Sequence, residues 1–167
     1  FEQLGVDQIF VDEADMFKNL YYVTKMTRVA GLPNSQSNRA MDMFIKSQYL
    51  TRLNNGKRGV VFATGTPIAN SMAEMYTMQR YLSMSHLKEL GVQAFDSWVQ
   101  NFAMPQTGME LAPEGTGYRM NTRFTRFINV AELLTAFRSF ADVKNAEDLN
   151  LPRPKLKTGK PIIVSVS

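Results

Sequence analysis

Two short apolar runs, each ending abruptly in polar residues, set the first expectation for the fold. Residues 8–11 (Gln-Ile-Phe-Val) stop at acidic side chains, and residues 59–63 (Gly-Val-Val-Phe-Ala) lead into Thr64-Gly65-Thr66-Pro67. Uninterrupted apolar runs that end in polar loops are typical of buried parallel strands. The pattern therefore predicts two such strands, each with a polar loop at its carboxyl end.

A helical pattern lies between the two apolar runs. Ser37 can cap its start, apolar side chains recur at helical spacing from Met41 to Leu53, and Asn54-Asn55-Gly56 ends it. A strand, a helix and a second strand in this order form the right-handed crossover unit of a parallel sheet. We therefore expect an α/β fold in which helices flank a parallel sheet.

The second half of the chain predicts further helices and one β-hairpin. Its segments are a helix that starts at a capping box in residues 71–74, a helix with core-type aromatic spacing in residues 95–102, a hairpin whose arms are residues 109–112 and 118–120, a helix that opens at Asn129, a basic linker over residues 155–160 and a last strand in residues 162–164.

Composition restricts the class of protein. The 167 residues are 44% hydrophobic and 20% charged, as in ordinary globular domains, and they include no cysteine. Thiol catalysis, cysteine-ligated zinc and iron–sulfur clusters are therefore excluded. The lack of cysteine suits a reducing cytoplasm, and no apolar run approaches the ~18 residues that span a bilayer. We expect a cytoplasmic protein without a membrane partner.

Charge is distributed unevenly. Lys and Arg exceed Asp and Glu by 19 to 15, yet the first fifteen residues hold five acidic and no basic side chains, whereas residues 16–58 hold eight basic side chains and one acidic side chain. Nine basic residues follow between 119 and 160. An acidic cluster flanked by basic stretches suits a metal ion beside a polyanion, although such charged faces are also often simply solvated.

The strongest chemical signal is Val11-Asp12-Glu13-Ala14-Asp15, at the end of the first predicted strand. Carboxylates at a strand end can coordinate Mg²⁺ while a neighbouring carboxylate orients the attacking water, as nucleoside-triphosphate hydrolysis requires. The five residues alone are a weak signal. Lys18-Asn19 at a short offset, and Thr64-Gly65-Thr66-Pro67-Ile68-Ala69-Asn70 after the second strand, make it specific.

These segments resemble those of superfamily-two helicases. Residues 11–15 resemble motif II, the Asp-Glu-Ala-Asp/His box, and residues 63–70 are similar to motif III in its Swi/Snf-type form, as Lys18-Asn19 is to the Swi/Snf-type extension of motif II. Residues 1–19, 60–82 and 110–115 also resemble the helicase part of very large DNA methyltransferase–helicase proteins of conjugative elements, plasmids and phages.

The resemblance implies a role for each motif residue. Asp12 would be the carboxylate that holds Mg²⁺, Glu13 would polarise the hydrolytic water, and Asp15 would couple the nucleotide site to motif III. Thr64, Gly65 and Thr66 would relay the nucleotide state to the nucleic-acid track. The residues alone favour a turn from Thr64 to Pro67 in which a threonine hydroxyl caps backbone donors, and both interpretations can be true together.

The resemblance also implies the cofactors, the partners and the organisation of a longer parent protein. The cofactors would be ATP and Mg²⁺, and the parent would be an ATP-dependent DNA helicase or translocase fused to an adenine-specific DNA methyltransferase of a mobile element. Residues 1–83 would be the C-terminal half of a RecA-like first lobe, residues 84–150 a helical and hairpin insertion, and residues 151–167 a linker and first strand toward the second lobe.

One element of a helicase motor does not occur in the sequence. The phosphate-binding loop G-x-x-x-x-G-K-[ST] is absent. We therefore expect the chain to be a piece whose partners are DNA, a P-loop half on its N-terminal side and a second RecA-like lobe. Because it lacks the loop that holds the phosphates, the isolated chain should have no appreciable ATPase activity.

Arg119, Arg123 and Arg126 alternate with Phe124 and Phe127 in the second half of the chain. Positive charge interleaved with aromatic faces is the combination that single-strand binders use, which makes the three arginines candidates for nucleic-acid contact. The alternative is a twisted hairpin in which the phenylalanines pack inward and the arginines stay solvated. The rival function from another class is a DNA-binding or domain-docking module without nucleotide chemistry.

Overall fold

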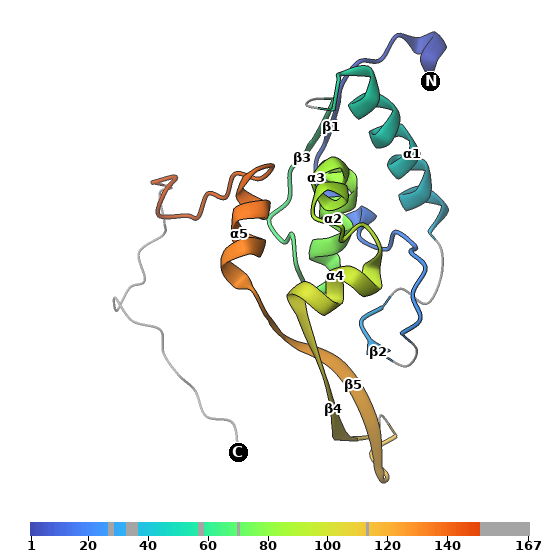
Figure 1. Ribbon diagram of the computed structural model, residues 1–167, viewed down its shortest axis with the longest axis vertical. Coiled ribbons are helices and arrows are strands. Elements are labelled where there is room, and N and C mark those ends of the chain that lie inside the picture. The colour runs from blue at the N-terminus through green and yellow to red at the C-terminus, as the bar shows by residue number, and fades with distance from the viewer. Residues whose placement is uncertain (27–28, 33–36, 57–58, 70, 113, 151–167) are drawn as a thin grey trace, which may run out of the picture.

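The fold is mixed α/β, as the sequence predicts (Figure 1). The computed structural model describes residues 1–26, 29–32, 37–56, 59–69, 71–112 and 114–150, so the predicted linker and last strand (residues 151–167) lie outside the described residues. The elements in chain order are the 3₁₀ helix η1 (Glu2–Leu4), β1 (Ile9–Val11), the 3₁₀ helix η2 (Ala14–Phe17), β2 (Val29–Ala30), α1 (Asn38–Leu53), β3 (Val60–Phe62), α2 (Ala73–Leu82), α3 (Met84–Glu89), α4 (Phe95–Phe102), β4 (Ala103–Leu111), β5 (Tyr118–Phe127) and α5 (Val130–Arg138).

The parallel pairing of the predicted crossover unit is confirmed, but the prediction that both strands are buried is wrong, because Phe10 and Val61 are exposed. Strands β1 and β3 pair in parallel, with Ile9 opposite Val60 and Val11 opposite Phe62, and α1 connects them. The Ser37 hydroxyl accepts a hydrogen bond from the Ala40 N–H (3.3 Å), which is the predicted cap of α1. One side of this small sheet packs on a cluster around Leu20, Ala40 and Tyr81, and Phe62 takes part in it.

Helix α2 is the centre of the molecule. Eight of its ten residues are buried, because it lies between the cluster beside α1 and a larger core formed mainly by α4. In the larger core Trp98 is fully buried, and its Nε1–H donates a 2.7 Å hydrogen bond to the side-chain oxygen of Gln79 on α2. The predicted core role of the aromatic residues in 95–102 is therefore confirmed. None of the helices in the described ranges is long and apolar enough to cross a membrane.

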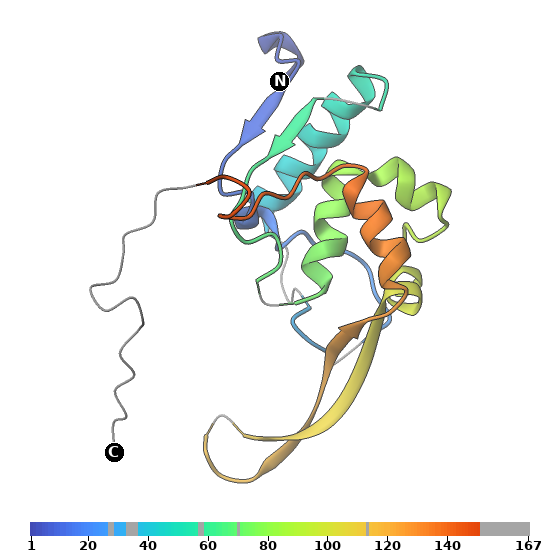
Figure 2. The same cartoon turned by 90° about the vertical axis from the view of Figure 1, so that its left-hand side faces the viewer.

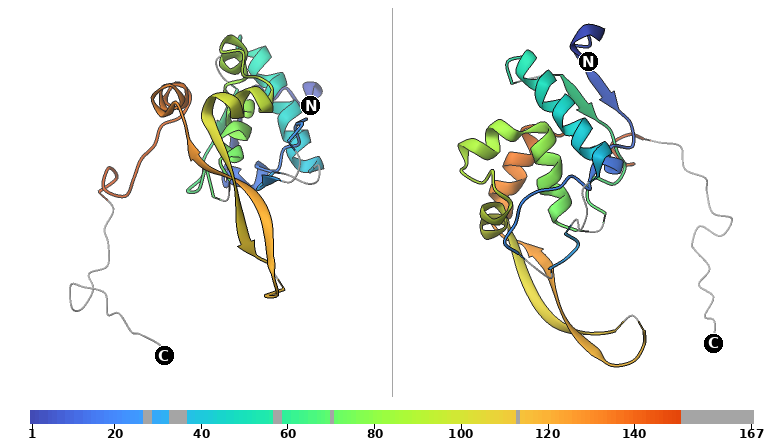
Figure 3. Two further views of the ribbon diagram at one scale, coloured as in Figure 1. Left: turned by 60° about the horizontal axis from the view of Figure 1, so that its bottom comes forward. Right: turned by 90° about the vertical axis from the view of Figure 1, so that its right-hand side faces the viewer.

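The predicted hairpin exists and is longer than expected. Antiparallel strands β4 (Ala103–Leu111) and β5 (Tyr118–Phe127) project beyond the helices, with β2 alongside β5 near the base (Figures 2 and 3). The predicted first arm began only at Met109, because Pro105 and Gly108 are typical of loops, whereas β4 begins at Ala103. Strand β4 is the outer strand of the order β2-β5-β4, where a residue without an N–H is tolerated.

The hairpin has two chemically different faces. Directly opposed residues of an antiparallel pair share a face, so the register places Ala103, Pro105, Thr107, Met109 and Leu111 with Phe127, Phe124, Thr122, Met120 and Tyr118 on one face. A register irregularity leaves Thr125 as an extra residue and sets Arg126 opposite Met104. Arg119, Arg123 and Arg126 consequently all lie on the other, polar face.

A close approach fixes the base of the hairpin against α2. Gly31 follows β2 with a φ of +85°, and a Cβ there would lie 2.8 Å from both the Cβ and Oγ atoms of Ser71, just before α2. Ala30 pairs with Arg123 of β5, and a cavity of about 190 Å³ is lined by Ala30, Gly31, Ser71, Arg123 and Phe124. Only glycine combines this backbone conformation with this contact.

Substitution of Gly31 by Ala should destabilise the protein more than the same change at Gly117. The two backbones are alike, with φ of +85° and +87°, but a Cβ at Gly117 would meet no atom within 4 Å. Both variants should lose about 1 kcal/mol from the left-handed conformation, and Gly31→Ala should lose a further ~1–3 kcal/mol from overlap with Ser71. Urea unfolding followed by circular dichroism measures the difference. Equal losses would show that Ser71 moves aside freely.

Candidate functional site

The two motif segments leave the sheet at the same edge. Beyond the paired strands, the Ala63 N–H donates to the Val11 carbonyl (2.8 Å), and the Ala14 N–H donates to the Ala63 carbonyl (3.0 Å). The ladder therefore continues past the strand ends and holds the loops of residues 12–15 and 63–66 side by side. The two segments that carry the predicted carboxylates and threonines are thus brought to one edge of the sheet.

The turn after β1 has an unusual backbone conformation. Glu13 lies in the left-handed region (φ 52°, ψ 49°), and its N–H donates a 3.0 Å hydrogen bond to Oδ1 of Asp12. Such a conformation costs a non-glycine residue on the order of 1–3 kcal/mol and often occurs at functional sites. It turns the chain from β1 into η2 within two residues, and the side chains of Asp12 and Glu13 remain exposed at the sheet edge.

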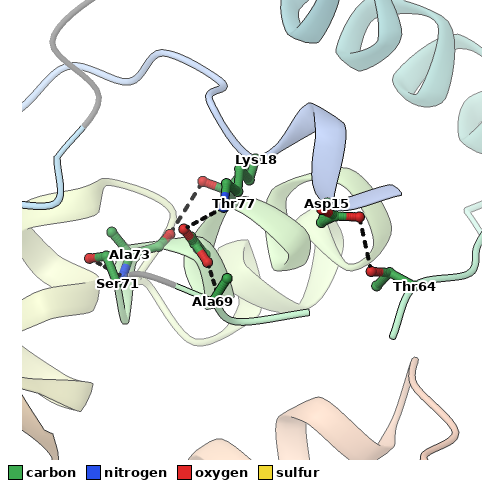
Figure 4. Close-up of polar contacts among 8 residues, drawn as sticks. Asp15, Lys18, Thr64, Ala69, Ser71, Ala73 and Thr77 are labelled. Carbon is green, nitrogen blue, oxygen red and sulfur yellow. Dashed lines mark hydrogen bonds and ion pairs between the residues drawn. The ribbon is translucent and has the colours of Figure 1, made fainter. Parts of the chain in front are cut away.

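Asp15 and Thr64 connect the two loops directly. The Thr64 hydroxyl donates a 3.1 Å hydrogen bond to Oδ1 of Asp15, across 49 positions of sequence (Figure 4). The same hydroxyl accepts a 3.1 Å hydrogen bond from the Thr66 N–H. The turn-capping interpretation of Thr64 is therefore confirmed, and the capping hydroxyl also contacts the last carboxylate of the acidic segment.

A second link joins the loops through a residue whose role the sequence did not reveal. Glu74 at the start of α2 forms an ion pair with Lys18 (3.3 Å) and accepts a 2.6 Å hydrogen bond from the Ala69 N–H (Figure 4). Both side chains are largely buried. Lys18 follows the acidic segment and Ala69 belongs to the second loop, so the carboxylate of Glu74 holds the two segments together.

The predicted capping box does not form. The Ser71 hydroxyl accepts a hydrogen bond from the Ala73 N–H (3.2 Å), and Met72 occupies the N-cap position of α2 without a side-chain cap. The Glu74 carboxylate accepts from Ala69, although a capping box would direct it to Ser71. The ion-pair partner of Glu74 is Lys18, which lies 56 positions earlier in the sequence, so the spacing of residues could not predict it.

Short helix η2 is fixed from two sides. The buried Tyr81 hydroxyl lies within hydrogen-bond distance of the carbonyl oxygens of Phe17 (3.1 Å) and Ala40 (2.8 Å), and thus ties η2 to α1 and α2. Burial raises the pKa of Tyr81, which keeps the phenol protonated and able to donate. Arg39 of α1 donates to the Met16 carbonyl (3.1 Å). The acidic loop is therefore held by packed helices.

The site offers few protein ligands for a metal. Within the described residues, no group of three or more His, Asp or Glu side chains converges to enclose a metal ion. Mg²⁺ usually takes one or two carboxylates and completes its shell with water and substrate phosphates. Exposed Asp12 at the sheet edge fits that requirement, whereas a metal held only by protein ligands does not fit here.

The three candidate arginines of the hairpin differ in their surroundings. Arg123 forms a two-point contact with Glu110, through Nε (2.6 Å) and one terminal nitrogen (2.8 Å). Asn121 also donates to Glu110, and this hydrogen bond and the one from Arg123 hold the pKa of that carboxyl below its usual range. Arg126 contacts the sulfur of Met104 (3.1 Å), and Arg119 lies opposite Glu110 in the register.

The two phenylalanines between the arginines pack inward. Phe124 and Phe127 lie against the core that contains Trp98, and the rings of Phe124 and Phe95 meet edge to face with centroids 6.1 Å apart. The packed alternative is correct for these two rings, so neither is available to stack on a base. The arginines stay on the opposite, polar face.

A cavity lies away from these groups. It has a volume of about 470 Å³ and lies between the C-terminal end of α1 and α3, with Arg52, Asn55, Ser85 and Lys88 among its lining residues. No residue of the two motif loops lines it. The candidate site is an open sheet edge, separate from this cavity.

The comparison with known families agrees with this arrangement. Residues 1–145 match the family described as "Probable helicase domain", and because the match covers most of the chain, the protein belongs to that family of helicase domains. Over 153 residues it is 30% identical to Defense against restriction protein B of Escherichia phage P1. That match covers 89% of this chain and only 7% of the phage protein. No solved structure matches significantly.

Proposed function

We propose that this chain is the part of an ATP-dependent DNA helicase or translocase that activates the hydrolytic water and passes the nucleotide state onward. The observation that carries the proposal is the hydrogen bond between Thr64 and Asp15, which joins two motif-like loops at the carboxyl edge of parallel strands. Ligands of open α/β sheets bind at this edge. The family of helicase domains supports the same function.

Each residue at the edge has a role in this proposal. When bound with ATP, Mg²⁺ neutralises charge on the phosphates, and Asp12 would hold it. Glu13, on its exposed left-handed turn, would polarise the attacking water. Asp15 would respond to the nucleotide through the acidic loop of residues 12–15. Its hydrogen bond to Thr64 would pass the nucleotide state to Thr64 and then to Gly65 and Thr66 in the second loop.

The proposal includes the organisation of a larger parent protein. Residues 1–83 would complete a RecA-like lobe whose P-loop half lies elsewhere in the parent, residues 84–150 would be an insertion, and residues 151–167 would lead to the second lobe. The resemblance of residues 1–19, 60–82 and 110–115 supports a fusion with an adenine-specific DNA methyltransferase of a mobile element. The phage relative, of which this chain spans 7%, is a much longer protein, which supports a large parent.

DNA would be the partner of the polar face of the hairpin. Arg119 and Arg126 have no carboxylate within ion-pair distance in the described part of the chain, whereas the charge of Arg123 is already paired with Glu110. Positive side chains on one face can neutralise phosphates without sequence preference. Arg119 and Arg126 should therefore contribute more to phosphate binding than Arg123.

Substitution of Thr64 by Val in the full-length protein should uncouple hydrolysis from DNA. The change keeps the shape of the side chain and removes the hydroxyl that donates to Asp15 and caps the turn. A hydrogen bond to a charged group contributes about 1.5–3 kcal/mol, so stimulation of ATP hydrolysis by DNA should fall at least about tenfold. Steady-state hydrolysis with and without DNA, together with nucleotide binding, measures the change.

The matched control is Thr135→Val. That hydroxyl donates to the Ala131 carbonyl within α5 and touches neither loop. A double-mutant cycle of Thr64→Val with Asp15→Ala should show strong non-additivity, because each change removes the same hydrogen bond. Equal loss of basal and stimulated hydrolysis in Thr64→Val would mean that Thr64 only supports the turn, and would count against the coupling role.

A further inference from the structure

The segment after β3 has an exposed part that is held at both of its ends. Residues 65–68, called the exposed loop below, are all exposed. Thr64, the residue before them, donates a hydrogen bond to Asp15 (3.1 Å). Ala69, the residue after them, donates a hydrogen bond from its N–H to Glu74 (2.6 Å) (Figure 4). The exposed loop therefore lies between two fixed points.

The carboxylate of Glu74 divides its two oxygens between the two segments. Oε1 lies 3.3 Å from Nζ of Lys18, which follows Asp15 by three residues, and Oε2 accepts from the Ala69 N–H. The side chains of Glu74 and Lys18 are only 10% and 21% exposed. Because one carboxylate contacts both segments, the acidic segment and the far end of the exposed loop cannot separate without breaking a contact to a largely buried charge.

An ion pair in this position contributes little to net stability. Removing two charges from water costs about as much as their attraction returns, and apolar side chains of the same volume often stabilise a protein equally well or better. Charged hydrogen bonds, however, are directional and fix the positions of particular atoms. Glu74 also lies in the first turn of α2, where the helix N-terminus favours negative charge. These features suit a contact that defines geometry.

We propose that Glu74 is a positioning residue, which fixes the far end of the exposed loop relative to the acidic segment through Lys18 and Ala69. This role rests on the proposed function and adds a second connection to the one between Thr64 and Asp15. A loop that is held at one end can take many positions, whereas a loop held at both ends must follow the segment to which it is tied. The ion pair is therefore needed for the nucleotide state to reach the exposed loop.

The first test is Glu74→Gln in the full-length protein. The amide oxygen can still accept from Ala69, but the charge that binds Lys18 is lost. Misplacement of a loop by about 1 Å can cost 100-fold in rate, so DNA-stimulated ATP hydrolysis should fall by about 10- to 100-fold. The loss should appear in kcat and not in the KM for ATP, and hydrolysis without DNA should change much less. Glu132→Gln, at an exposed carboxylate in the first turn of α5, is the matched control and should have no effect.

The second test separates positioning from stability. Lys18→Met leaves the Glu74 carboxylate largely buried without that cation, which should lower the melting temperature of the 167-residue chain by about 6–12 °C. Lys18→Met combined with Glu74→Gln removes both charges and should recover most of this loss. In the full-length protein the same double variant should stay as poorly stimulated by DNA as Glu74→Gln. Lys144→Met breaks an exposed ion pair with Asp142 and should change neither property.

Several results would overturn the positioning role. Unchanged stimulation by DNA in Glu74→Gln, or an equal loss of basal and stimulated hydrolysis, would show that the ion pair does not serve coupling. Recovery of stimulation together with stability in the double variant, or no recovery of stability, would show that the pair only supports the fold. The double variant therefore decides the question even where a single variant does not fold.

Failure of this proposal can be told apart from failure of the proposed function. If Glu13→Gln abolishes hydrolysis and Glu74→Gln leaves stimulation by DNA intact, the proposed function stands and the positioning role of Glu74 is wrong. If Glu13→Gln leaves hydrolysis unchanged, the proposed function itself is wrong. Steady-state hydrolysis with and without DNA, measured at a temperature at which circular dichroism shows each variant to be folded, provides both readouts.

Discussion

Substitution of Glu13 by Gln in the full-length protein should slow ATP hydrolysis by about 100- to 10,000-fold while ATP binding stays nearly unchanged. The amide has the shape of the carboxylate and retains its hydrogen-bonding capacity, but it has no negative charge with which to polarise water. A loss confined to turnover is the signature of a group that acts in the transition state. Steady-state hydrolysis and binding of a fluorescent nucleotide provide the two measurements.

The control is Glu2→Gln, in which the same chemical change is made at an exposed carboxylate of η1. It should leave both hydrolysis and binding unchanged. The isolated 167-residue chain should show no appreciable ATPase activity with or without the substitution, because its sequence has no P-loop. If hydrolysis by the Glu13→Gln protein stayed within a few-fold of the unchanged protein, the motif II assignment would be wrong and a docking module would be favoured.

The largest expected effect on stability comes from Trp98→Ala, which should lower the free energy of unfolding by about 3–5 kcal/mol. Trp98 is fully buried beside Phe95, Tyr76 and Phe102, so its removal leaves a cavity in the larger core. The change also leaves the Gln79 side-chain oxygen without its hydrogen-bond donor. Urea unfolding followed by circular dichroism measures the loss, since Trp98 is the single tryptophan and its fluorescence disappears.

One conservative variant separates the cavity from the lost hydrogen bond, and a second tests an unpaired hydroxyl in the same core. Trp98→Phe fills most of the space but leaves Gln79 buried and unpaired, which should still cost about 1–3 kcal/mol. Tyr22→Phe removes a hydroxyl that is buried with no hydrogen-bond partner in the described part of the protein, so it should be neutral or stabilising. A Trp98→Phe protein as stable as the unchanged one would show that the Gln79 contact contributes nothing.

The local elements could be predicted from the sequence. The abrupt polar ends of two apolar runs predicted β1 and β3 as parallel strands, and Ser37 predicted the start of α1. The spacing of aromatic residues predicted α4 as a core helix. These signals are predictive because the hydrophobic periodicity of an element and the capping of a helix depend only on residues that are close in sequence. The sequence also predicted a polar loop at the carboxyl end of each strand, and the parallel pairing brings both loops to one edge.

The long-range details could not be predicted. The ion pair of Lys18 with Glu74 links positions far apart in sequence, and no local pattern marks it. The extra residue Thr125 changes the alternation of β5 and brings Arg126 to the same face as Arg123. Simple alternation along the strand would place Arg126 on the opposite face. The exposure of apolar side chains such as Met109 and Tyr118 could not be predicted for a related reason, because it depends on where the hairpin leaves the body.

The parallel pairing of β1 with β3 has a consequence for how the protein acquires its functions during folding. Asp15 and Thr64 meet only after the chain between them has closed a long loop, which makes the edge a late-forming, non-local structure. The β4–β5 hairpin pairs residues close in sequence and can form early. A partly folded chain would therefore possess the β4–β5 hairpin before it possesses the assembled edge.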